Sequence, residues 1–534
     1  MFKRLKSHSS FFFVFLVFCF FYLSLFFLKP INLFTADLGR HLINGREIIA
    51  SLPQRSPVFD TNYFSYTYPD YPFMNHHWLF GVLAWGWYRL FGFVGLQLMN
   101  ASLKALAVVL MLGGVMFFSR QRGRFFAGAV ALALVLPLVT ARVEVRPETF
   151  SLLSLAVFYL SFLSFSKGKL KFWQMMALLL PLEIVWVNMH IFWFFSFVVW
   201  GAFFIHHLIE KKWQELKQLA AAGFLMAVTT LVNPFTWHLS LYPTQILKNY
   251  GYQIAENQTI LFMIRRFGWP IYYYTVALAL GLMVLVFLNF YLKKIKLNWH
   301  DLILAGVFLL ASFKLNRLLP FLGLMLLVIF FQFGRWLFEF VKQHNYFVSL
   351  LSRKLYLVPL LTIIGFVSFL GVVASGLWLP PLTQLYLGTL PQTFSLANFL
   401  KENQVAGPIF NNYDLGGYLI FNLFPNKRVF VDNRPEAYPV KFLQAEYVKA
   451  QESEEVWRQV LDRYQFQAIV FYRLDQTPWA QPFLIKRLKD PDWTPVYVDA
   501  YSIVFLKKTN KNQSLIKKFA LPAEIFAVNK DTKN

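Results

Sequence analysis

The chain has 534 residues, of which 57% are hydrophobic and 15% charged, whereas soluble domains are about half apolar and about a quarter charged. This composition excludes a soluble enzyme. The 51 Lys and Arg residues exceed the 27 Asp and Glu residues, but they lie in short clusters between apolar runs, which is typical of membrane topology and not of a nucleic-acid interface. We therefore expect membrane lipids, and no nucleic acid, among its partners.

The first apolar run, residues 11–28, predicts a membrane-spanning helix, because about 20 apolar residues cross a bilayer. It follows a basic segment and precedes Lys29-Pro30, where a signal peptide would have small residues. We therefore expect an uncleaved helix with its N-terminus in the cytoplasm. The only cysteine, Cys19, lies in this run, so the sequence offers no disulfide framework and no thiolate metal site.

Residues 79–118 include enough apolar residues for two helices but are expected to cross the membrane once. We place residues 97–118 across the bilayer. Residues 79–96, which contain Arg89, Gly92 and Gly95, are expected to lie along the outer interface.

Basic clusters separate the later apolar runs and would face the cytoplasm. The runs between them pair as hairpins: 125–141 with 149–166, 172–187 with 191–209, 219–232 with 271–292, and 300–313 with 318–333. A last helix, 355–378, would lead outward. The expected architecture is an all-α polytopic membrane domain of about 11 transmembrane helices, with the N-terminus inside and the C-terminus outside.

The chain becomes far more polar from Pro380 onward and alternates helical patterns with short β-rich runs. The expected strands are 407–410, 428–431, 468–472 and a hairpin of 495–499 with 502–506. The expected helices are 394–402, one capped by Asp414 that runs through Phe421, and 440–463. The pattern predicts a small C-terminal α/β domain on the outer face. The expected domains are a transmembrane domain (1–378) with the first outer loop (31–96), an extracytoplasmic α/β domain (379–508) and a polar tail (509–534).

Polar residues gather at the outer ends of the expected helices, whereas a transporter would place them near the middle of the membrane. They are Asp37, Arg40, His41, His76, His77, Glu144, Arg146, Glu148, Asn188, His190, Asn233, Glu256, Arg265, Arg266, Lys314 and Arg317. Their common location predicts a polar cleft at the outer membrane surface.

Asp37 and His41 are four residues apart, so in a helix they share one face and could pair or hold a metal ion together. The alternative is a helix N-cap at Asp37 and an interfacial histidine. The location of the pair, directly after the first transmembrane helix, favours a role in the cleft.

Arg146-Pro147-Glu148 forms a turn between two expected spans. The turn is either a topology anchor, in which Arg146 pairs with Glu144 or Glu148, or part of an anion site. In the second case Arg146, together with Lys314, Arg317, Arg265 and Arg266, would bind a lipid-linked phosphate and stabilise it as a leaving group.

Several other polar residues have both a functional and a structural interpretation. Asn188 and His190 stand at one helix mouth but could merely satisfy the backbone of the turn, and Asn233-Pro234 could be a helix stop. In the C-terminal domain a set of polar residues forms either a rim facing the membrane part or an Asp N-cap and a buried Asp/Arg pair. The residues of this set are Asn411, Asn412, Tyr413, Asp414, Asp432 and Arg434.

The order of several motifs over about residues 10–440 resembles one known family. The motifs are Asp37-Leu-Gly-Arg-His41-Leu-Ile-Asn-Gly45, Asp60-Thr-Asn-Tyr-Phe-Ser-Tyr-Thr67, His76-His77-Trp78-Leu79, Arg146-Pro147, Trp186 to His190, Asn233-Pro234, Gly416-Gly417-Tyr418-Leu419 and Phe430-Val-Asp432-Asn-Arg434. The family is the GT-C superfamily of membrane glycosyltransferases, which includes the protein O-mannosyltransferases and the aminoarabinose transferase of lipid A. The chain departs from the pattern at His77, where the family has an acidic residue, and at Arg40, where it has Trp.

The resemblance implies an inverting glycosyltransferase that moves a hexosyl or pentosyl group from a polyprenyl-phosphate donor to a lipid, glycan or protein acceptor on the extracytoplasmic side. Asp37 matches the base of the superfamily, with His41 beside it, and Arg146, Lys314 and Arg317 become candidates for the donor phosphate. The cofactor stays open, with a divalent cation at Asp37 and His41 as one candidate.

Two other function classes fit the sequence. One is a lipid-linked glycan flippase or transporter, and the other is a non-catalytic envelope scaffold with the same fold. The low cysteine content, the Lys- and Phe-rich composition and the lack of organellar targeting suggest a bacterial plasma membrane.

Overall fold

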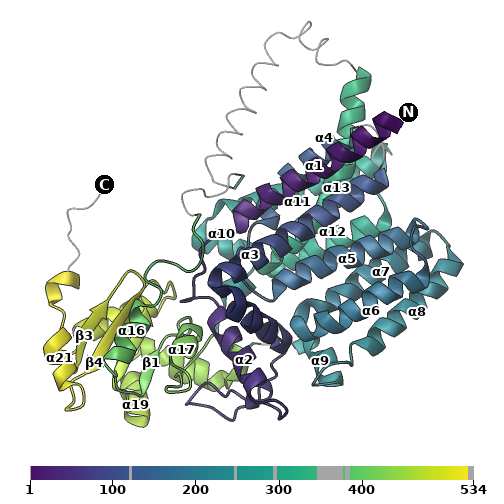
Figure 1. Ribbon diagram of the computed structural model, residues 1–534. Coiled ribbons are helices and arrows are strands. Elements are labelled where there is room, and N and C mark those ends of the chain that lie inside the picture. Colours follow the sequence, from purple (N-terminus) through teal and green to yellow (C-terminus); the bar gives the residue numbers. More distant parts are fainter. Residues whose placement is uncertain are drawn as a thin grey trace, which may run out of the picture. The chain divides into compact units, whose positions relative to one another are not determined.

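In the computed structural model most of the chain is helical, and a small mixed sheet lies in the C-terminal part (Figure 1). The structure describes residues 2–119, 123–245, 249–292, 297–344, 377–378 and 385–526. The chain divides into two compact units, which we call the helical unit and the sheet unit. The helical unit comprises Met1–Pro30, Leu96–Pro243 and Gln253–Leu387, and the sheet unit comprises Ile31–Gly95, Thr244–Tyr252 and Gly388–Asn534. The first outer loop, predicted to belong to the transmembrane domain, instead falls in the sheet unit with the C-terminal residues.

Seven helices in the described part of the chain are long and apolar enough to cross a membrane. They are Ser10–Phe27, Trp78–Ser119, Glu148–Ser166, Phe172–Met189, Ile191–Ile209, Pro270–Phe287 and Asn316–Glu339, and a shorter apolar helix covers Arg124–Val139. A chain with this many apolar helices is a multi-pass membrane protein. The number of about 11 crossings and the sidedness of the termini stay predictions, and the expected helix 355–378 lies, apart from 377–378, outside the described residues.

The helices of the helical unit follow the expected runs closely in most cases. They are α1 (Phe2–Phe27), α4 (Arg124–Val139), α5 (Glu148–Ser166), α6 (Phe172–Met189), α7 (Phe195–Ile209), α8 (Trp213–Thr229), α9 (Trp237–Leu241), α10 (Ile260–Phe267), α11 (Pro270–Leu292), α12 (Trp299–Lys314) and α13 (Leu319–His344). The helix α8 begins at Trp213 and not at residue 219. Its first turns are amphipathic, with Leu216 and Leu219 buried, and a search for apolar runs misses such a pattern.

The helix α3 (Trp78–Ser119) contains a kink at Gly92, where φ is +62° and ψ is −162°. Glycine adopts this backbone conformation readily because it lacks a Cβ atom. The boundary between the two units follows shortly after the kink, between Gly95 and Leu96. The structure thus separates the segment before residue 97 from the apolar segment after it, as the sequence suggests, while the interfacial location of the first segment stays a prediction.

The core of the helical unit is formed by α4, α5, α7, α12 and α13. The helix α4 packs most extensively on α13, and α12 packs on both α13 and α7. This packing brings together two turns, the one that follows α4 and the one that precedes α13. Both turns carry arginines, which form the candidate site described below.

The sheet has four strands in the order β1-β2-β4-β3. The strands are β1 (Ile409–Asn411), β2 (Ala468–Tyr472), β3 (Trp493–Val498) and β4 (Ser502–Lys507). The strand β1 is parallel to β2, whereas β4 is antiparallel to both β2 and β3. The expected hairpin near the C-terminus therefore forms, with β3 beginning at Trp493.

The expected strand at 428–431 is wrong. Only Val429 forms an isolated parallel bridge, with Ser65, and its N–H donates to the carbonyl of Phe64 at 3.1 Å. Phe430 and Val431 are fully buried. The apolar run is thus explained by burial in the core, and its backbone partner is the first loop of the chain and not the sheet.

The sheet unit also contains short helices. They are α2 (Leu38–Ala50), α16 (Ser395–Glu402), α17 (Gly416–Leu423), α18 (Lys449–Glu452), α19 (Glu454–Tyr464), α20 (Ala480–Leu488) and α21 (Gln513–Phe519). The helix expected at 440–463 is divided, because Ser453 has extended backbone and its hydroxyl accepts a hydrogen bond from the Val456 N–H. Asp414 does not cap α17, whose N-cap is Leu415. The helix α21 lies within the segment expected to be a polar tail.

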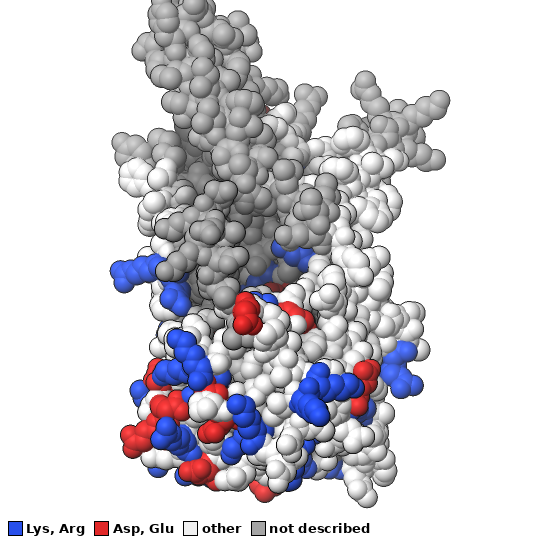
Figure 2. All heavy atoms as spheres, turned by 90° about the vertical axis from the view of Figure 1, so that its left-hand side faces the viewer, with Lys and Arg blue, Asp and Glu red and all other residues white. Residues whose placement is uncertain are grey.

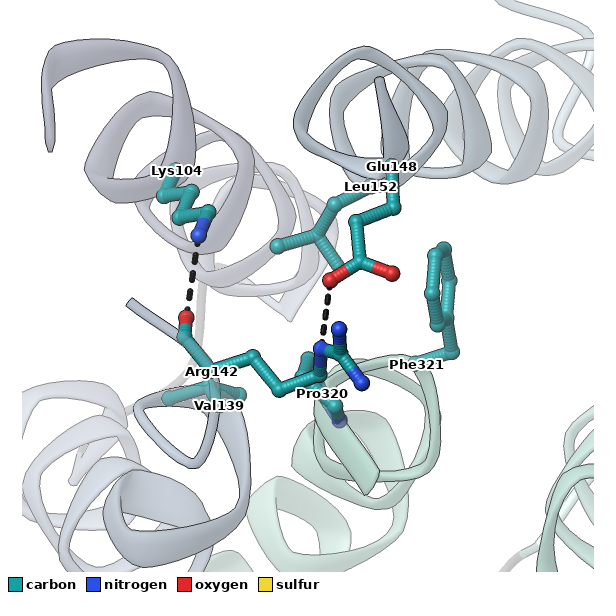
Figure 3. Close-up of a pocket in the computed structure, with 7 residues that line it drawn as sticks. All are labelled: Lys104, Val139, Arg142, Glu148, Leu152, Pro320 and Phe321. Atoms are coloured by element: carbon teal, nitrogen blue, oxygen red, sulfur yellow. Dashed lines mark hydrogen bonds and ion pairs between the residues drawn. The ribbon is translucent and has the colours of Figure 1, made fainter. Parts of the chain in front are cut away.

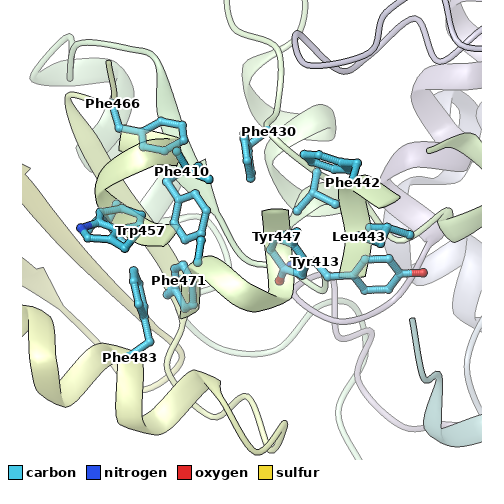
Figure 4. Close-up of a cluster of buried hydrophobic side chains, with 14 of the residues drawn as sticks. Phe410, Tyr413, Phe430, Phe442, Leu443, Tyr447, Trp457, Phe466, Phe471 and Phe483 are labelled. Atoms are coloured by element: carbon cyan, nitrogen blue, oxygen red, sulfur yellow. The ribbon is translucent and has the colours of Figure 1, made fainter. Parts of the chain in front are cut away.

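Aromatic side chains form the core of the sheet unit (Figure 4). The ring of Phe410, on β1, lies 5.0 Å from the rings of both Phe430 and Trp457 and 5.6 Å from that of Phe483. Aromatic rings at such distances contribute packing energy beyond the area that they bury. Phe430 anchors the loop that follows it, so the core also holds the segment Asp432-Asn433-Arg434.

The helix α2 lies against the start of α3 at a glycine pair. A Cβ atom added to Gly45 would stand 2.0 Å from the carbonyl oxygen of Gly81, which no side chain could tolerate. Gly45 therefore permits a close helix contact that holds α2, and with it Asp37 at the start of α2.

Charges of both signs intermingle on the surface. Figure 2 views the molecule from the side on which β3, β4 and α21 lie in Figure 1 and shows Lys and Arg next to Asp and Glu over the described surface. Exposed pairs in the sheet unit include Lys449 with Glu452 at 2.7 Å and Arg463 with Glu446 at 2.8 Å. The formal net charge of +24 is thus not gathered into a patch of one sign on this face.

Candidate functional site

Three arginines of the helical unit converge on one carboxylate, that of Glu256. Arg142 Nη2 lies 2.8 Å from Glu256 Oε2, Arg146 Nη1 lies 2.9 Å from the same oxygen, and Arg317 Nη1 lies 3.8 Å from Oε1. Arg142 Nε also lies 2.6 Å from Glu148 Oε1. We call these five residues the arginine cluster.

The turn that carries Arg142 and Arg146 is held from α3. The Lys104 ammonium donates to the carbonyls of Arg142 and Glu144, both at 2.9 Å, and Asn100 Nδ2 donates to the carbonyl of Val143 at 2.8 Å. Lys104 is 3% exposed. The buried ammonium therefore fixes the turn and does not extend to the surface, as a long side chain near a membrane interface often does.

The loop that carries Glu256 is held by Asn316, in the turn before α13. Asn316 Nδ2 donates to the carbonyls of Ala255 at 2.8 Å and Gln258 at 3.0 Å, and the Asn316 N–H donates to Gln258 at 3.1 Å. These bonds explain why Glu256 and Arg317 face each other although they are far apart in sequence. Hydrogen bonds to backbone carbonyls thus hold both the turn with Arg142 and Arg146 and the loop with Glu256.

The cluster is partly desolvated and carries more cations than anions. The exposed side-chain fraction is 12% for Arg142, 15% for Arg146, 16% for Arg317 and 24% for Glu256. Burial disfavours the charge on Glu256, but Arg142, Arg146 and Arg317 together outweigh burial and hold the pKa of Glu256 well below its ordinary value. A set of guanidinium groups that is partly buried has the chemistry of an anion site.

A pocket lies directly beside the cluster (Figure 3). Its polar lining comes from Lys104, Arg142 and Glu148 and its apolar lining from Val139, Leu152, Pro320 and Phe321. Figure 3 shows the Glu148 carboxylate facing the Arg142 guanidinium, with Phe321 on the side of Glu148. The pocket thus combines a charged and an apolar lining.

The structure places only part of the predicted phosphate site in the cluster. Arg146, Arg317, Glu148 and Glu256 belong to it, and Arg142 joins them although the sequence analysis did not select it. Lys314, Arg265 and Arg266 are exposed and lie outside the five residues of the arginine cluster. The signal for Arg142 is its place four residues before Arg146 in one short turn.

Two further predicted residues, Asn188 and Asn233, donate hydrogen bonds to backbone carbonyls, and a third, His190, contacts a serine hydroxyl. Asn188 Nδ2 donates to the carbonyls of Ile184 and Val232, both at 2.8 Å, and Asn233 Nδ2 donates to that of Thr230 at 2.7 Å. The imidazole Nδ1 of His190 lies 2.8 Å from Ser151 Oγ. The His190 ring also packs on Phe192 at 4.5 Å, and Phe192 in turn lies under the guanidinium of Arg317 at 4.8 Å.

Asp37 lies in the sheet unit, as the N-cap residue of α2, but its side chain makes no capping hydrogen bond. Its Oδ1 accepts a hydrogen bond of 2.6 Å from Asn433 Nδ2, and its Oδ2 lies 3.9 Å from Arg40 Nη2. The Asp37 side chain is 24% exposed. The carboxylate is therefore partly accessible and is held by a residue that the sequence analysis missed.

The histidines expected beside Asp37 are packed among aromatic rings. His41 is 1% exposed, and its ring makes edge contacts with Phe80 at 5.0 Å and His77 at 5.4 Å. His76 Nδ1 lies 3.1 Å from the carbonyl of Met74. In the described part of the chain no group of three or more His, Cys, Asp or Glu side chains is arranged to hold a metal ion, and a cation held by Asp37 and His41 alone stays a prediction.

The polar residues of the C-terminal part are mostly buried, and a rim that faces the membrane part stays a prediction. Asp432 and Arg434 are 0% and 1% exposed, and Arg434 donates from Nε to Asp432 Oδ1 at 2.8 Å and from Nη2 to Oδ2 at 2.6 Å. Asn411 and Asn412 are also fully buried. The buried Asp/Arg pair of the structural alternative is therefore present, whereas its Asp N-cap is not.

Asp37 belongs to the sheet unit and the arginine cluster to the helical unit. That they meet in one pocket, as the sequence analysis expects, stays a prediction.

Neither a protein-family model nor a curated protein matches the sequence. Solved structures match the fold. The archaeal oligosaccharyltransferase AglB from Archaeoglobus fulgidus, in complex with an inhibitory peptide and a dolichol-phosphate, matches with a TM-score of 0.58 and 12% identity over 92% of this chain and 74% of its own.

Two structures of ArnT from Cupriavidus metallidurans also match. The apo state has a TM-score of 0.54 and 14% identity over 97% of this chain and 100% of its own. The state bound to undecaprenyl phosphate has a TM-score of 0.52 and 14% identity over 97% and 99%. These neighbours are of the GT-C type, so the chain has a GT-C fold. The resemblance stated from the sequence motifs is thereby confirmed at the level of the fold.

Proposed function

We propose that the protein is an integral membrane glycosyltransferase that moves a sugar from a polyprenyl-phosphate donor to an acceptor on the extracytoplasmic side of the plasma membrane. The arginine cluster carries the proposal. In a chain with a GT-C fold, three guanidinium groups beside a pocket with an apolar wall suit the phosphate of a lipid-linked donor. A topology anchor, the alternative considered for Arg146, would not need its cations to be buried.

The reaction follows from the two sites. Asp37 would take a proton from the acceptor hydroxyl or amine as that group attacks the anomeric carbon. The bond from this carbon to the phosphate oxygen breaks, and the polyprenyl phosphate leaves with the bonding electrons. Arg142, Arg146 and Arg317 would stabilise the charge that develops on the leaving phosphate. Attack from the side opposite the leaving group inverts the anomeric configuration.

The solved neighbours support a lipid-phosphate donor. AglB is solved with a dolichol-phosphate and ArnT with undecaprenyl phosphate. The acceptor class, whether lipid, glycan or protein, and the sugar are matters for experiment. So is the cofactor, since a divalent cation near Asp37 would have to be supplied with further ligands by substrate or water.

The test is to identify polyprenyl phosphates that co-purify with the protein by mass spectrometry and then to assay transfer with the corresponding donors. Arg146→Ala/Arg317→Ala should lose the bound lipid, because removing the cations that pair with a partly desolvated anion costs about 2–5 kcal/mol. A matched control is Arg124→Ala/Arg335→Ala, which removes two arginines that lie about 20 Å or more away along α4 and α13.

The control should retain the lipid. Equal lipid retention by both double variants would contradict the phosphate site. A folded wild-type protein that binds no polyprenyl phosphate and transfers no sugar would favour a non-catalytic envelope scaffold.

A further inference from the structure

Asp37, Arg40 and Asn433 form a closed polar triangle in the sheet unit. Asn433 Nδ2 donates to Asp37 Oδ1 at 2.6 Å, Arg40 Nε donates to Asn433 Oδ1 at 3.3 Å, and Arg40 Nη2 lies 3.9 Å from Asp37 Oδ2. Asp37 and Arg40 come from the start of α2, whereas Asn433 lies 396 residues after Asp37. The C-terminal part of the chain thus supplies one of the groups that hold this carboxylate.

The chemistry of the neighbours fixes the orientation of the Asn433 amide. A carboxylate can only accept hydrogen bonds, and a guanidinium can only donate them. The amide must therefore turn its NH₂ group to Asp37 and its oxygen to Arg40. Arg40 is 3% exposed, so little water competes for this oxygen.

The backbone around Asn433 is also fixed. Its neighbours Asp432 and Arg434 form a buried pair, and Arg434 Nη2 further donates to Asn62 Oδ1 at 2.7 Å. The Asp432 N–H donates to the Tyr438 hydroxyl at 3.0 Å. The amide that reaches Asp37 is therefore attached to a segment that several hydrogen bonds hold.

The helix α17 approaches this segment closely. A Cβ atom added to Gly416 would lie 2.4 Å from the Cα atom of Asp432. The Gly-Gly sequence at the start of α17 thus leaves room for the loop that carries Asn433. Two separate motifs, Gly416-Gly417-Tyr418-Leu419 and Phe430-Val-Asp432-Asn-Arg434, thus pack against each other.

We propose that Asn433 is a positioning residue for Asp37 and that the C-terminal domain thereby takes part in the transfer reaction. The inference rests on the proposed function, in which Asp37 is the base. The amide holds Oδ1, Arg40 Nη2 lies 3.9 Å from Oδ2, and together they fix the rotamer of the carboxylate. A base that is held in this way meets the acceptor proton in a defined geometry, and that geometry determines the rate.

The charged and titratable groups around the carboxylate must be counted before its pH dependence is predicted. On α2 they are Arg40 and His41. The segment after β1 contributes Tyr413 and Asp414, and the loop that carries Asn433 contributes Asp432, Arg434 and Glu436. Asn433→Asp is isosteric but replaces the donor by a second carboxylate in contact with Asp37. Like charges disfavour ionisation, so this variant should move the acidic limb of the kcat/KM profile to higher pH by about one unit or more.

The experiment measures the release of undecaprenyl phosphate from undecaprenyl-phosphate-linked hexoses and pentoses, with a membrane extract as the acceptor source, by the full-length protein in detergent or nanodiscs. Asn433→Ala should lower kcat by about 10- to 100-fold with an unchanged donor KM, since loss of alignment affects the chemical step. The control is Asn422→Ala, which removes a half-buried amide of the same unit that donates only to the Tyr418 carbonyl.

The outcomes separate the inference from the function on which it rests. If Asp37→Asn is inactive while both Asn433 variants keep the wild-type kcat and the wild-type acidic limb, the positioning role is overturned and the proposed function stands. If Asp37→Asn turns over, Asp37 is not the base and the positioning role is overturned with it. If the wild-type protein releases no undecaprenyl phosphate, the proposed function fails. Should Asn433→Ala unfold, as judged by size-exclusion chromatography, the isosteric Asn433→Asp decides.

Discussion

Arg146 Nη1 lies 3.0 and 2.9 Å from the two carboxylate oxygens of Glu256 and thereby links the turn before α5 to the loop before α10. Arg142 and Arg317 approach the same carboxylate. Glu256 is thus an internal anion in a set of cations that could also bind a phosphate. A donor phosphate at this site would either displace the carboxylate or share the guanidinium groups with it.

We expect Glu256→Gln to bind polyprenyl phosphate more tightly than the wild-type protein, by about tenfold, because the variant keeps the shape of the side chain but removes the competing charge. Native mass spectrometry with undecaprenyl phosphate measures the change. The control is Glu215→Gln in the first turn of α8. Unchanged or weaker binding by Glu256→Gln would show that the carboxylate does not compete with the ligand.

Glu256 also makes a pH-dependent contribution to stability. Burial raises the pKa of this carboxyl, but the three arginines lower it by a larger amount. The folded-state pKa is therefore well below the ordinary value of 4.5. The stability from Glu256 is therefore fully present above about pH 4.5 and is lost as pH falls through the lower, folded-state pKa.

The difference in Tm between the wild-type protein and Glu256→Gln should accordingly stay constant from pH 5.5 to 8, at about 2–4 °C in favour of the wild type, and should narrow only below about pH 4.5. Thermal unfolding at a series of pH values measures it. A difference that already disappears between pH 7 and 5.5 would contradict the depressed pKa.

Asp37→Asn should preserve expression and folding but abolish transfer. The amide keeps the volume of the side chain, and Asp37 makes no capping bond whose loss would destabilise α2. An amide, however, cannot accept the acceptor proton. Comparison of expression level, Tm and donor turnover between the two proteins tests this, and retained turnover would exclude Asp37 as the base.

Much of the helical unit could be predicted from the sequence, because long apolar runs determine both the helices and their burial in a bilayer. The runs behind α4, α5 and α6 are of this kind. The runs in the C-terminal part are less informative, since an apolar run such as the one at 428–431 is equally consistent with a strand and with a buried loop. Only the tertiary partner of this segment, the first loop, distinguishes the two.

The sequence predicted that arginines would gather in a site, but it did not predict all of the residues that form it. Arg146 and Arg317 stand next to prolines or helix ends, where charged residues attract notice, whereas Arg142 resembles any cation at a helix end until Glu256 is placed opposite it. Asn433 could not be found at all, because an asparagine between Asp432 and Arg434 looks like part of a polar turn. Its role depends on a hydrogen bond to a residue at the other end of the chain.

The contact between α2 and α3 should be sensitive to a single methyl group. Gly45→Ala places Cβ 2.0 Å from the Gly81 carbonyl, and the overpacking should destabilise the sheet unit by about 1–3 kcal/mol. Gly86→Ala on the same α3 has no atom within 4 Å of the added Cβ and should be neutral or slightly stabilising. Hydrogen exchange in α2 measures the effect, and equal protection in both variants would contradict the contact.

Lys104→Met should weaken donor binding without removing any group from the arginine cluster. The variant leaves the carbonyls of Arg142 and Glu144 without the ammonium that they share, and a buried carbonyl that loses its donor costs about 1–3 kcal/mol. The turn will relax to find other donors, which moves Arg142 and Arg146 relative to Glu256. Because the cations remain, undecaprenyl phosphate should still bind but about tenfold more weakly. Lys217→Met, on the exposed side of α8, is the matched control, and an equal affinity for undecaprenyl phosphate in the two variants would mean that the turn keeps its geometry without Lys104.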